Sequence, residues 1–409
     1  MKYIIILGDG MSDRPIERLG GKTPLMAADI PAIDSLCARG RCGKFATVPA
    51  DLAPGSAVAN LSVLGYNPAE VFQGRGVLEA ASMGVKLDFT DLAMRCNLIC
   101  IEDGKIKNHS AGHISTEESH ELVSALQKEL GSETMIFHPG ISYRHLFVLK
   151  EGSSSIQCTP PHDVPGTAFS EVMVEASDQA GEETAAILNR LILRSQGVLK
   201  NHPVNLKRIA AGKDPANSVW FWSPGFKPKM KTFKELYGVK GAVISAVDLV
   251  KGLGVYAGLD VIEVEGATGL FDTNYEGKAQ AAVDALKSDY DFVFLHVEAT
   301  DEAGHEGDVE LKIKTIEYLD HRIVRFVVEE TGKMQEDVAI GITPDHGTPC
   351  EVRTHVHDPV PFLIYRPGDK PDSVTVYDEV STENGSMGTV TGDAFIRALF
   401  GLQAPENRR

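Results

Sequence analysis

The chain has 409 residues and a formal net charge of −17, from 40 lysines and arginines against 57 aspartates and glutamates. This acidic balance argues against a nucleic-acid-binding protein and against docking on an anionic membrane, because both need a basic surface. It suits a protein that holds divalent cations. The length predicts two to three domains at ~150 residues each, and an apolar content of 43% is sufficient for a large core.

The N-terminal segment is not typical of a secretion signal. Residues 3–8 are the only uncharged run before Asp9, whereas a signal peptide needs an apolar region of roughly 7–15 residues. No apolar run approaches the ~20 residues of a membrane span. The cysteines are scattered and form no Cys-x-x-Cys pair, which favours reduced thiols and a cytoplasmic protein. They are Cys37, Cys42, Cys96, Cys100, Cys158 and Cys350.

Short apolar runs, largely β-branched or aromatic, alternate with helical stretches along the chain. The runs predict buried strands of a parallel or mixed sheet. Helical spacing begins at Ile30 and is expected to stop at the glycine Gly40. A long amphipathic helix is predicted over 313–326, between two of the strands, and strand–helix–strand is the crossover unit of α/β folds. The predicted strands are 3–7, 292–297, 338–342 and 362–364.

The middle of the chain has a different pattern. A hairpin is predicted around Asp103-Gly104, and a helix after Ser115 carries a Ser115…Glu118 capping box. Another helix is predicted near 181–196, after a Pro/Gly-rich stretch at 158–166. We therefore predict an inserted α+β domain over 86–215, and an α/β core formed by 1–85 and 216–409.

Acidic and imidazole groups follow three predicted strands or precede the fourth. In open α/β sheets, ligands bind outside the carboxyl ends of the strands, so these groups should converge on one rim. Two or three carboxylates with three imidazoles form a typical ligand set for a Zn²⁺ or Mn²⁺ pair. Any one of them alone could be an ordinary turn or loop residue; together they predict a dinuclear metal site. The residues are Asp9, Asp301, His305, Asp345, His346 and His355.

Ser56 precedes a run over 57–64 that has helical character. Two interpretations stay open. Serine is a favoured helix N-cap, which would be a purely structural role. Alternatively, Ser56 is a nucleophile at a helix N-terminus, where the helix dipole and free N–H groups favour an incoming phosphate and a metal would lower the hydroxyl pKa.

Several motifs distributed over nearly the whole chain occur together in one known family. They are GDGMSD (8–13), APGSAVAN (53–60), QGRG (73–76), YGVKGAV (237–243), EGATG (265–269), DEAGH (301–305), PDHG (344–347) and HVHDPVP (355–361). With them the chain resembles the archaeal-type, cofactor-independent phosphoglycerate mutases of the alkaline phosphatase superfamily. The resemblance implies an α/β, alkaline-phosphatase-like three-layer core with a central, mostly parallel sheet, and an inserted α+β domain that caps the substrate pocket.

The resemblance also implies roles for individual residues. One metal would be held by Asp301, His305 and His355, with His355 rather than His357 as the ligand. The other would be held by Asp9, Ser56, Asp345 and His346, and Ser56 would accept the phosphoryl group and later return it. Two Mn²⁺ ions are expected, with Zn²⁺, Co²⁺ or Mg²⁺ as alternatives, and no 2,3-bisphosphoglycerate is required.

Further candidates would bind substrate or move protons. Asp163 and Lys240 are catalytic candidates beside Ser56, and a small phosphorylated metabolite is the expected substrate. The substrate-binding candidates are Arg75, His109, His113, Arg144 and Lys240. Each of those in the inserted domain could equally be a surface residue.

The segment 220–225 departs from the family pattern. It reads WFWSPG where the resemblance leads us to expect an Arg-Gly pair. The expected reaction is interconversion of 3-phosphoglycerate and 2-phosphoglycerate through a phosphoserine. The departure keeps phosphorylation of homoserine as an alternative, and a metal-dependent phosphatase or a structural metal-binding domain would use the same residues. The oligomeric state is left open.

Overall fold

The computed structural model describes residues 1–403 and divides the chain into two units. Unit 1 comprises Met1–Phe72 and the described residues from Met230 onward, and unit 2 comprises Gln73–Lys229. The predicted insertion is present, but its boundaries at 85/86 and 215/216 are wrong. Strand β9 (Ser218–Gly225) pairs with β3 (Asp91–Glu102), and helix α5 (Arg75–Ser82) brings the Gly76 backbone against Met94 of β3, so both flanking segments belong to unit 2.

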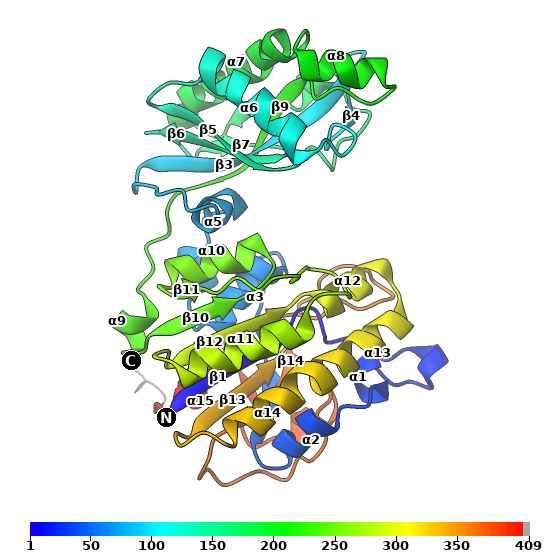
Figure 1. Cartoon of the computed structure of the whole chain (residues 1–409), viewed down its shortest axis with the longest axis vertical. Helices are drawn as coiled ribbons and strands as arrows, with labels where there is room; N and C mark the ends of the chain where they lie inside the picture. The colour runs from blue at the N-terminus through cyan, green and yellow to red at the C-terminus, as the bar shows by residue number, and fades with distance from the viewer. Residues whose placement is uncertain (404–409) are drawn as a thin grey trace. The chain divides into compact units, whose positions relative to one another are not determined.

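Unit 1 is built on an eight-stranded sheet in the part of the chain that is described (Figure 1). Only β14 runs against the direction of its neighbours, so the predicted mostly parallel sheet is confirmed. In spatial order the strands are β11 (Asp260–Val261), β10 (Gly241–Ile244), β12 (Phe292–Val297), β1 (Lys2–Gly8), β13 (Val338–Thr343), β14 (Val360–Tyr365), β2 (Arg41–Phe45) and β15 (Thr389–Val390).

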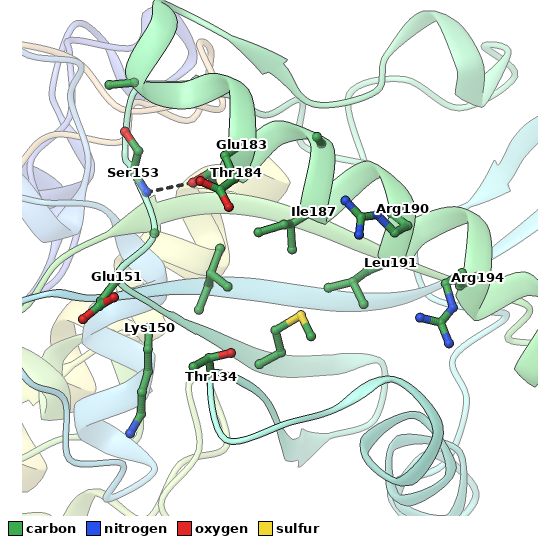
Figure 2. Close-up of a pocket in the computed structure, with 15 residues that line it drawn as sticks. Thr134, Lys150, Glu151, Ser153, Glu183, Thr184, Ile187, Arg190, Leu191 and Arg194 are labelled. Carbon is green, nitrogen blue, oxygen red and sulfur yellow. Dashed lines mark hydrogen bonds between the residues drawn. The ribbon is translucent and has the colours of Figure 1, made fainter.

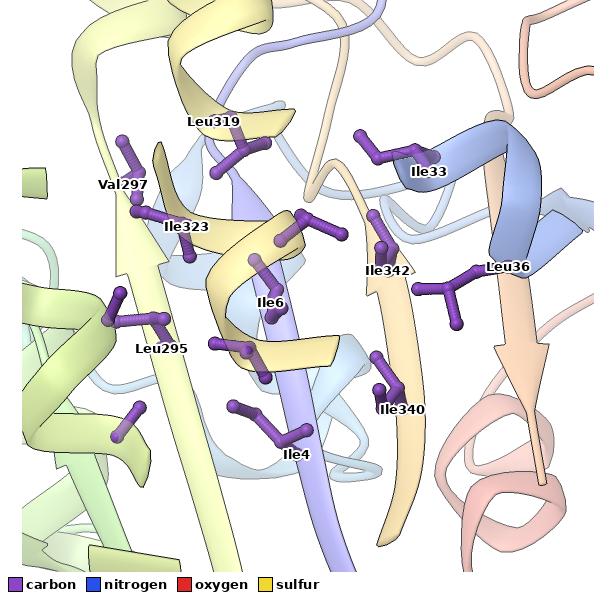
Figure 3. Packing of buried hydrophobic residues seen from close by; sticks show 14 of the residues in the cluster. Ile4, Ile6, Ile33, Leu36, Leu295, Val297, Leu319, Ile323, Ile340 and Ile342 are labelled. Atoms are coloured by element: carbon purple, nitrogen blue, oxygen red, sulfur yellow. The ribbon is translucent and has the colours of Figure 1, made fainter. Parts of the chain in front are cut away.

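Helices cover both faces of this sheet because alternate strand residues are apolar on each side. Ile4 and Ile6 of β1 pack against the helical segment that contains Leu319 (Figure 3). On the opposite face Tyr3 meets Phe400, with ring centroids 4.5 Å apart. Each fully buried apolar side chain, such as Ile4 or Ile6, contributes ~1.5–3 kcal/mol to the stability of the fold. The covering helices include α2 (Pro31–Cys37), α11 (Tyr275–Lys287) and α13 (Val309–Tyr318) on the first face, and α15 (Ala394–Phe400) on the second.

Two helices of the structure differ in detail from the sequence prediction. Helix α2 ends at Cys37 with Ala38 in right-handed conformation, and Gly40 has no positive φ, so Gly40 is not the helix stop. A Cβ at Gly40 would lie 2.7 Å from the carbonyl oxygen of Ile364, so glycine is needed for a close approach to β14. The predicted long helix is present as α13, a π-helical turn over Leu319–Val324 and α14 (Arg325–Thr331).

Unit 2 has the predicted α+β character. Antiparallel strands β4 (Lys105–Asn108), β3, β6 (Arg144–Lys150) and β5 (Met135–Ile141) form its sheet, with β9 on β3. The β3–β4 hairpin turns at Asp103 and Gly104, both with positive φ, as a type I′ turn requires. The predicted capping box begins α6 (Thr116–Leu130), and α7 (Glu182–Leu199) is the later helix. Among residues 1–403, no helix has the length and apolar character needed to cross a membrane.

A buried lysine joins the loops at the carboxyl end of the unit 1 sheet. Lys312 of α13 is fully buried; its Nζ lies 3.0 Å from Asp13 Oδ2 and donates to the Thr348 carbonyl at 2.8 Å. Lys312→Met should lower the free energy of unfolding by ~3–5 kcal/mol, because it leaves the Asp13 charge buried and unpaired. Urea unfolding measures this. The matched control is Lys314→Met, which removes an exposed lysine of the same helix and should cost less than ~1 kcal/mol. Equal losses for the two variants would contradict the buried-pair account.

Candidate active site

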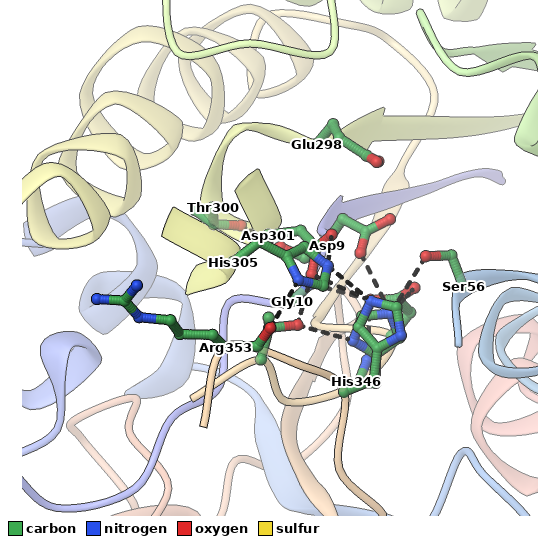
Figure 4. Close-up of polar contacts among 12 residues, drawn as sticks. Asp9, Gly10, Ser56, Glu298, Thr300, Asp301, His305, His346 and Arg353 are labelled. Atoms are coloured by element: carbon green, nitrogen blue, oxygen red, sulfur yellow. Dashed lines mark hydrogen bonds and ion pairs between the residues drawn. The ribbon is translucent and has the colours of Figure 1, made fainter. Parts of the chain in front are cut away.

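The carboxyl ends of three adjacent parallel strands carry the predicted polar groups. The register aligns Gly8 with Val297 and Leu7 with Thr343, so β1, β12 and β13 end level with one another. Asp9 directly follows β1, and Asp301 lies in helix α12 (Ala299–Glu306), which follows β12. Asp345 and His346 follow β13 after Pro344. The structure therefore brings these groups together at one rim, as Figure 4 shows for Asp9, Asp301 and His346.

Ser56 is the first residue of α3 (Ser56–Val63) and not its N-cap. Gly55 occupies the N-cap position, so the interpretation of Ser56 as the N-cap is wrong. Its Oγ instead lies 3.2 Å from His346 Nε2 (Figure 4). The hydroxyl is thus directed at the cluster, on the first turn of a helix whose unpaired N–H groups favour an anion.

Asp345 is held rigidly by hydrogen bonds from three elements. Its Oδ1 accepts from the backbone N–H groups of Gly10 at 3.1 Å and His346 at 2.8 Å. Its Oδ2 accepts from Asn60 Nδ2 at 2.8 Å, and the same amide group donates to the Ser56 carbonyl. Asn60 therefore joins the serine helix to the carboxylate. Sequence reasoning gave it no role, although a buried asparagine four residues after Ser56 on an otherwise apolar helix was a usable signal.

The first predicted ligand group converges on one point. The Nε2 atoms of His305 and His355 lie 3.0 Å apart, and Asp301 Oδ2 is 3.2 Å from His305 Nε2. His305 Nδ1 lies 3.1 Å from the Arg353 carbonyl and donates to it, which orients the ring so that Nε2 faces Asp301 and His355. Two imidazole nitrogens and a carboxylate at these separations fit a divalent cation. His357, by contrast, is exposed and donates to the Leu52 carbonyl at 2.9 Å.

The second group surrounds an oxygen that has no protein partner. Potential ligand atoms of Asp9, Asp345 and His346 lie within 4.8 Å of one another. Asp9 is fully buried, and its Oδ1 has no hydrogen bond; His346 Nε2 is 3.5 Å away. An unpaired buried oxygen costs ~1–3 kcal/mol, and a bound cation removes that cost. His346 also groups with Asp301 and His355, so it lies between the two sets of ligands.

The electrostatics of the cluster also call for positive charge. Burial raises the pKa of Asp9 well above its usual value, and the nearby charges of Asp345, Glu298 and Asp301 raise it further. Burial by itself would also raise the pKa of Asp301, but hydrogen bonds from His305 and His355 hold it well below its usual range. Carboxylates this close repel one another in a low-dielectric site. Divalent cations are the natural compensation, and the donors present fit them.

Two residues of the rim were missed by sequence reasoning. His296 interrupts the apolar strand β12, and its Nε2 lies 2.7 Å from Asp9 Oδ2. Burial lowers the pKa of this imidazole to about 3. Glu298 follows the same strand, and burial raises the pKa of its carboxyl to about 8. A histidine inside a fully buried strand was the available signal.

Lys240 does not lie at this rim, so its predicted catalytic and substrate-binding roles are wrong. It precedes β10 and therefore lies at the amino end of the parallel sheet, opposite the cluster. Its Nζ binds Asp289 Oδ2 at 2.5 Å and lies over the Tyr290 ring. These contacts describe a surface ion pair.

The candidates in unit 2 gather around a set of aromatic and imidazole rings. His109 lies 5.5 Å from Tyr143 and 6.0 Å from His162, measured between ring centroids, and His113 also contacts Tyr143. Arg144 follows Tyr143, and Asp163 follows His162, with its carboxylate 3.6 Å from the His162 Nε2. The structure therefore places these four predicted residues in one region of unit 2.

The unexpected aromatic segment has an arginine opposite it. Trp222 of β9 pairs with Arg95 of β3, and the Arg95 guanidinium lies 4.2 Å from the Trp222 ring. Arg95 is buried and forms an ion pair with Glu79 at 2.9 Å. Burial lowers the Arg95 pKa, Glu79 opposes this, and the positive charges of Arg75 and Arg144 lower it further. Arg144 pairs with β3 at Asn97, and Arg75 begins α5, which packs on β3 through Gly76, so the three arginines lie on or beside β3. Sequence reasoning missed Arg95, although a charged residue in an apolar strand was visible.

A pocket of about 510 Å³ also lies in unit 2, between α7 and strands β5 and β6 (Figure 2). Thr134, Lys150, Ile187 and Arg190 line it. It holds neither the serine nor the carboxylate–imidazole set, so it is separate from the candidate catalytic residues.

Comparison with known proteins places the chain in a family. The model of the 2,3-bisphosphoglycerate-independent phosphoglycerate mutase family matches residues 37–205. A Methanosarcina mazei protein named 2,3-bisphosphoglycerate-independent phosphoglycerate mutase is 54% identical over 98% of this chain and 100% of its own length. A solved structure of a Pyrococcus horikoshii protein has a TM-score of 0.83 at 33% identity, covering 99% of both chains. The cofactor-independent phosphoglycerate mutase of Thermoplasma acidophilum has a TM-score of 0.71 at 29% identity, covering 98% of this chain and 99% of its own. This chain therefore belongs to the 2,3-bisphosphoglycerate-independent phosphoglycerate mutase family.

Proposed function

We propose that the protein interconverts 3-phosphoglycerate and 2-phosphoglycerate without 2,3-bisphosphoglycerate. The observation that carries this proposal is Ser56: its hydroxyl caps nothing and lies 3.2 Å from His346 Nε2 in the carboxylate–imidazole cluster. A purely structural metal site does not require such a serine. The names of the similar proteins support phosphoglycerate as the substrate class.

The chemistry follows from the residues at the rim. Ser56 Oγ loses its proton and attacks phosphorus, the bond between phosphorus and the substrate oxygen breaks, that oxygen takes up a proton, and a phosphoserine forms. The retained glycerate reorients, its other hydroxyl attacks the phosphoserine, and Ser56 is regenerated. Two divalent cations, with Mn²⁺ the expected ion, would supply positive charge for the phosphoryl oxygens and favour the ionised Ser56 hydroxyl. One would be held by Asp301, His305 and His355, and the other by Asp9, Ser56, Asp345 and His346.

The candidate substrate-binding residues implied by the family resemblance, apart from Lys240, lie in unit 2. A phosphate and a carboxylate need cationic partners, and the group formed by Arg75, Arg95 and Arg144 provides them. Arg95 opposite Trp222 offers a cation near the segment where the expected arginine is missing. His109, His113 and Asp163 remain candidates for substrate contact or proton transfer in the same region.

Arg75→Ala should lower kcat/KM for 3-phosphoglycerate at least ~10-fold, since one charge-assisted contact contributes ~1.5–3 kcal/mol. Steady-state kinetics measures this. The matched control is Lys240→Ala, which removes an exposed lysine at the opposite end of the unit 1 sheet and should leave kcat/KM unchanged. A large loss for Lys240→Ala with none for Arg75→Ala would show that the structural placement misidentifies the substrate-binding cation.

Three assays on the purified protein test the proposed activity. One supplies 3-phosphoglycerate and Mn²⁺ without 2,3-bisphosphoglycerate, the second supplies homoserine and ATP, and the third measures phosphate release. We expect 2-phosphoglycerate formation with little free phosphate. Strong homoserine phosphorylation without mutase turnover would show that homoserine is the substrate instead of phosphoglycerate. Dominant phosphate release would indicate a phosphatase.

A further inference from the structure

We propose that His296 is a positioning residue that fixes the Asp9 carboxylate for the cation held by the Asp9 group. This inference rests on the cation assignment of the proposed function. His296 belongs to neither predicted ligand group and lies in β12, between β10 and β1 in the sheet. Its evidence is a chain of buried hydrogen bonds that runs from β10 through β12 to the end of β1.

His296 is fully buried and has a partner at each ring nitrogen. Nε2 lies 2.7 Å from Asp9 Oδ2, and Nδ1 lies 3.1 Å from Ser245 Oγ. Ser245 directly follows β10, and its Oγ accepts from the backbone N–H of Val247 at 3.0 Å. Glu298 Oε2 is 3.5 Å from Nε2, farther than the Asp9 oxygen.

These contacts define a direction for the protons. A carboxylate oxygen only accepts, so His296 Nε2–H is the donor to Asp9 Oδ2, and the Ser245 hydroxyl, whose oxygen accepts from Val247, can donate its own proton to Nδ1. Nδ1 is then the acceptor of the neutral ring, and Nε2–H donates to Asp9 Oδ2. The contact occupies one carboxylate oxygen and leaves the other, Oδ1, which has no hydrogen bond and faces His346.

The backbone of Asp9 is fixed independently of this contact. Its N–H donates to the Val297 carbonyl at 2.9 Å, and the Thr300 hydroxyl donates to its carbonyl. His296 therefore controls the rotation of the carboxylate and not the position of the loop. Loss of a partner that orients a metal ligand typically weakens metal binding 10–100-fold. The weakening should be confined to the Asp9 group, because His296 Nε2 is directed at Asp9.

Metal titration of the full-length chain, stripped of metal, tests this without any turnover. Isothermal titration calorimetry with Mn²⁺ would compare the wild type with His296→Leu, His296→Gln and Ser245→Ala. We expect two sites in the wild type. In His296→Leu one site should weaken ~10–100-fold, while the site of Asp301, His305 and His355 keeps its affinity. His296→Gln should restore most of the affinity, because its amide N–H can replace Nε2–H, and Ser245→Ala should give a smaller loss at the same site.

A matched control uses another buried histidine. His145 in unit 2 is 2% exposed, and His145→Gln should leave both affinities unchanged. Normal binding of both ions by His296→Leu, or equal weakening at both sites, would overturn the proposal. Three ions in the wild type and two in both His296 variants would also overturn it, because His296 would then be a ligand. If His296→Leu does not fold, His296→Gln and Ser245→Ala decide by the same site-selective criterion. Absence of mutase activity leaves this test intact, because its readout is metal affinity.

Discussion

Ser56→Ala should abolish mutase turnover, with a loss of at least ~10³–10⁴-fold in kcat, because no other group at the rim replaces the attacking oxygen. The fold should be retained, since the hydroxyl caps no helix and its contact is with His346. In the metal-free protein, the free energy of unfolding should change by less than ~1 kcal/mol. Turnover of 3-phosphoglycerate and a melting curve on the same preparation measure both quantities.

Ser62→Ala is the matched control for this experiment. Ser62 lies on the same helix, and its Oγ hydrogen-bonds to the Val58 carbonyl at 3.4 Å, within α3. The control variant should turn over at the wild-type rate. Near-normal turnover by Ser56→Ala would show that another residue accepts the phosphoryl group.

His355→Ala should remove one bound metal ion and at least ~100-fold of the activity. The His355 Nε2 converges with that of His305 at 3.0 Å, so the variant leaves the first ligand group with one imidazole and one carboxylate. Removing a residue that only orients a metal ligand typically costs 10–100-fold in metal affinity or activity, and removing a direct ligand should cost more. Metal content per chain after dialysis, measured beside turnover, tests both expectations.

His357→Ala provides the neighbouring control. His357 is exposed and donates to the Leu52 carbonyl, so its loss should leave metal content at the wild-type value. The reverse order, with His357→Ala losing metal and His355→Ala keeping it, would mean that the histidine pair is assigned one step out of place.

The rim could be predicted from sequence because strand direction is encoded in the crossover pattern. Consecutive strand–helix–strand units place carboxyl ends on one edge. Asp9, Asp301 and Asp345 each follow an apolar run closely, so their convergence required no knowledge of side-chain geometry. The cluster of Figure 4 is the result.

Other residues could not be placed for identifiable reasons. Lys240 was misplaced because strand β10 was not predicted; a residue before a parallel strand lies at the amino edge, away from the site. Arg95 and His296 were overlooked because each is a single polar residue within an apolar strand, and only the neighbouring strand supplies its partner. The capping interpretation of Ser56 differs from the structure by one residue: Gly55 is the N-cap, and the Ser56 hydroxyl contacts His346 instead.

Rapid acid quenching during turnover, followed by mass spectrometry of the Ser56 peptide, tests the central claim most directly. The protein would be mixed with 3-phosphoglycerate and Mn²⁺ in the absence of 2,3-bisphosphoglycerate. The account predicts 2-phosphoglycerate in solution together with a phosphate on Ser56 that forms within one turnover and is absent in Ser56→Ala. Mutase turnover that requires added 2,3-bisphosphoglycerate, or that proceeds with phosphate on a different residue, would contradict it.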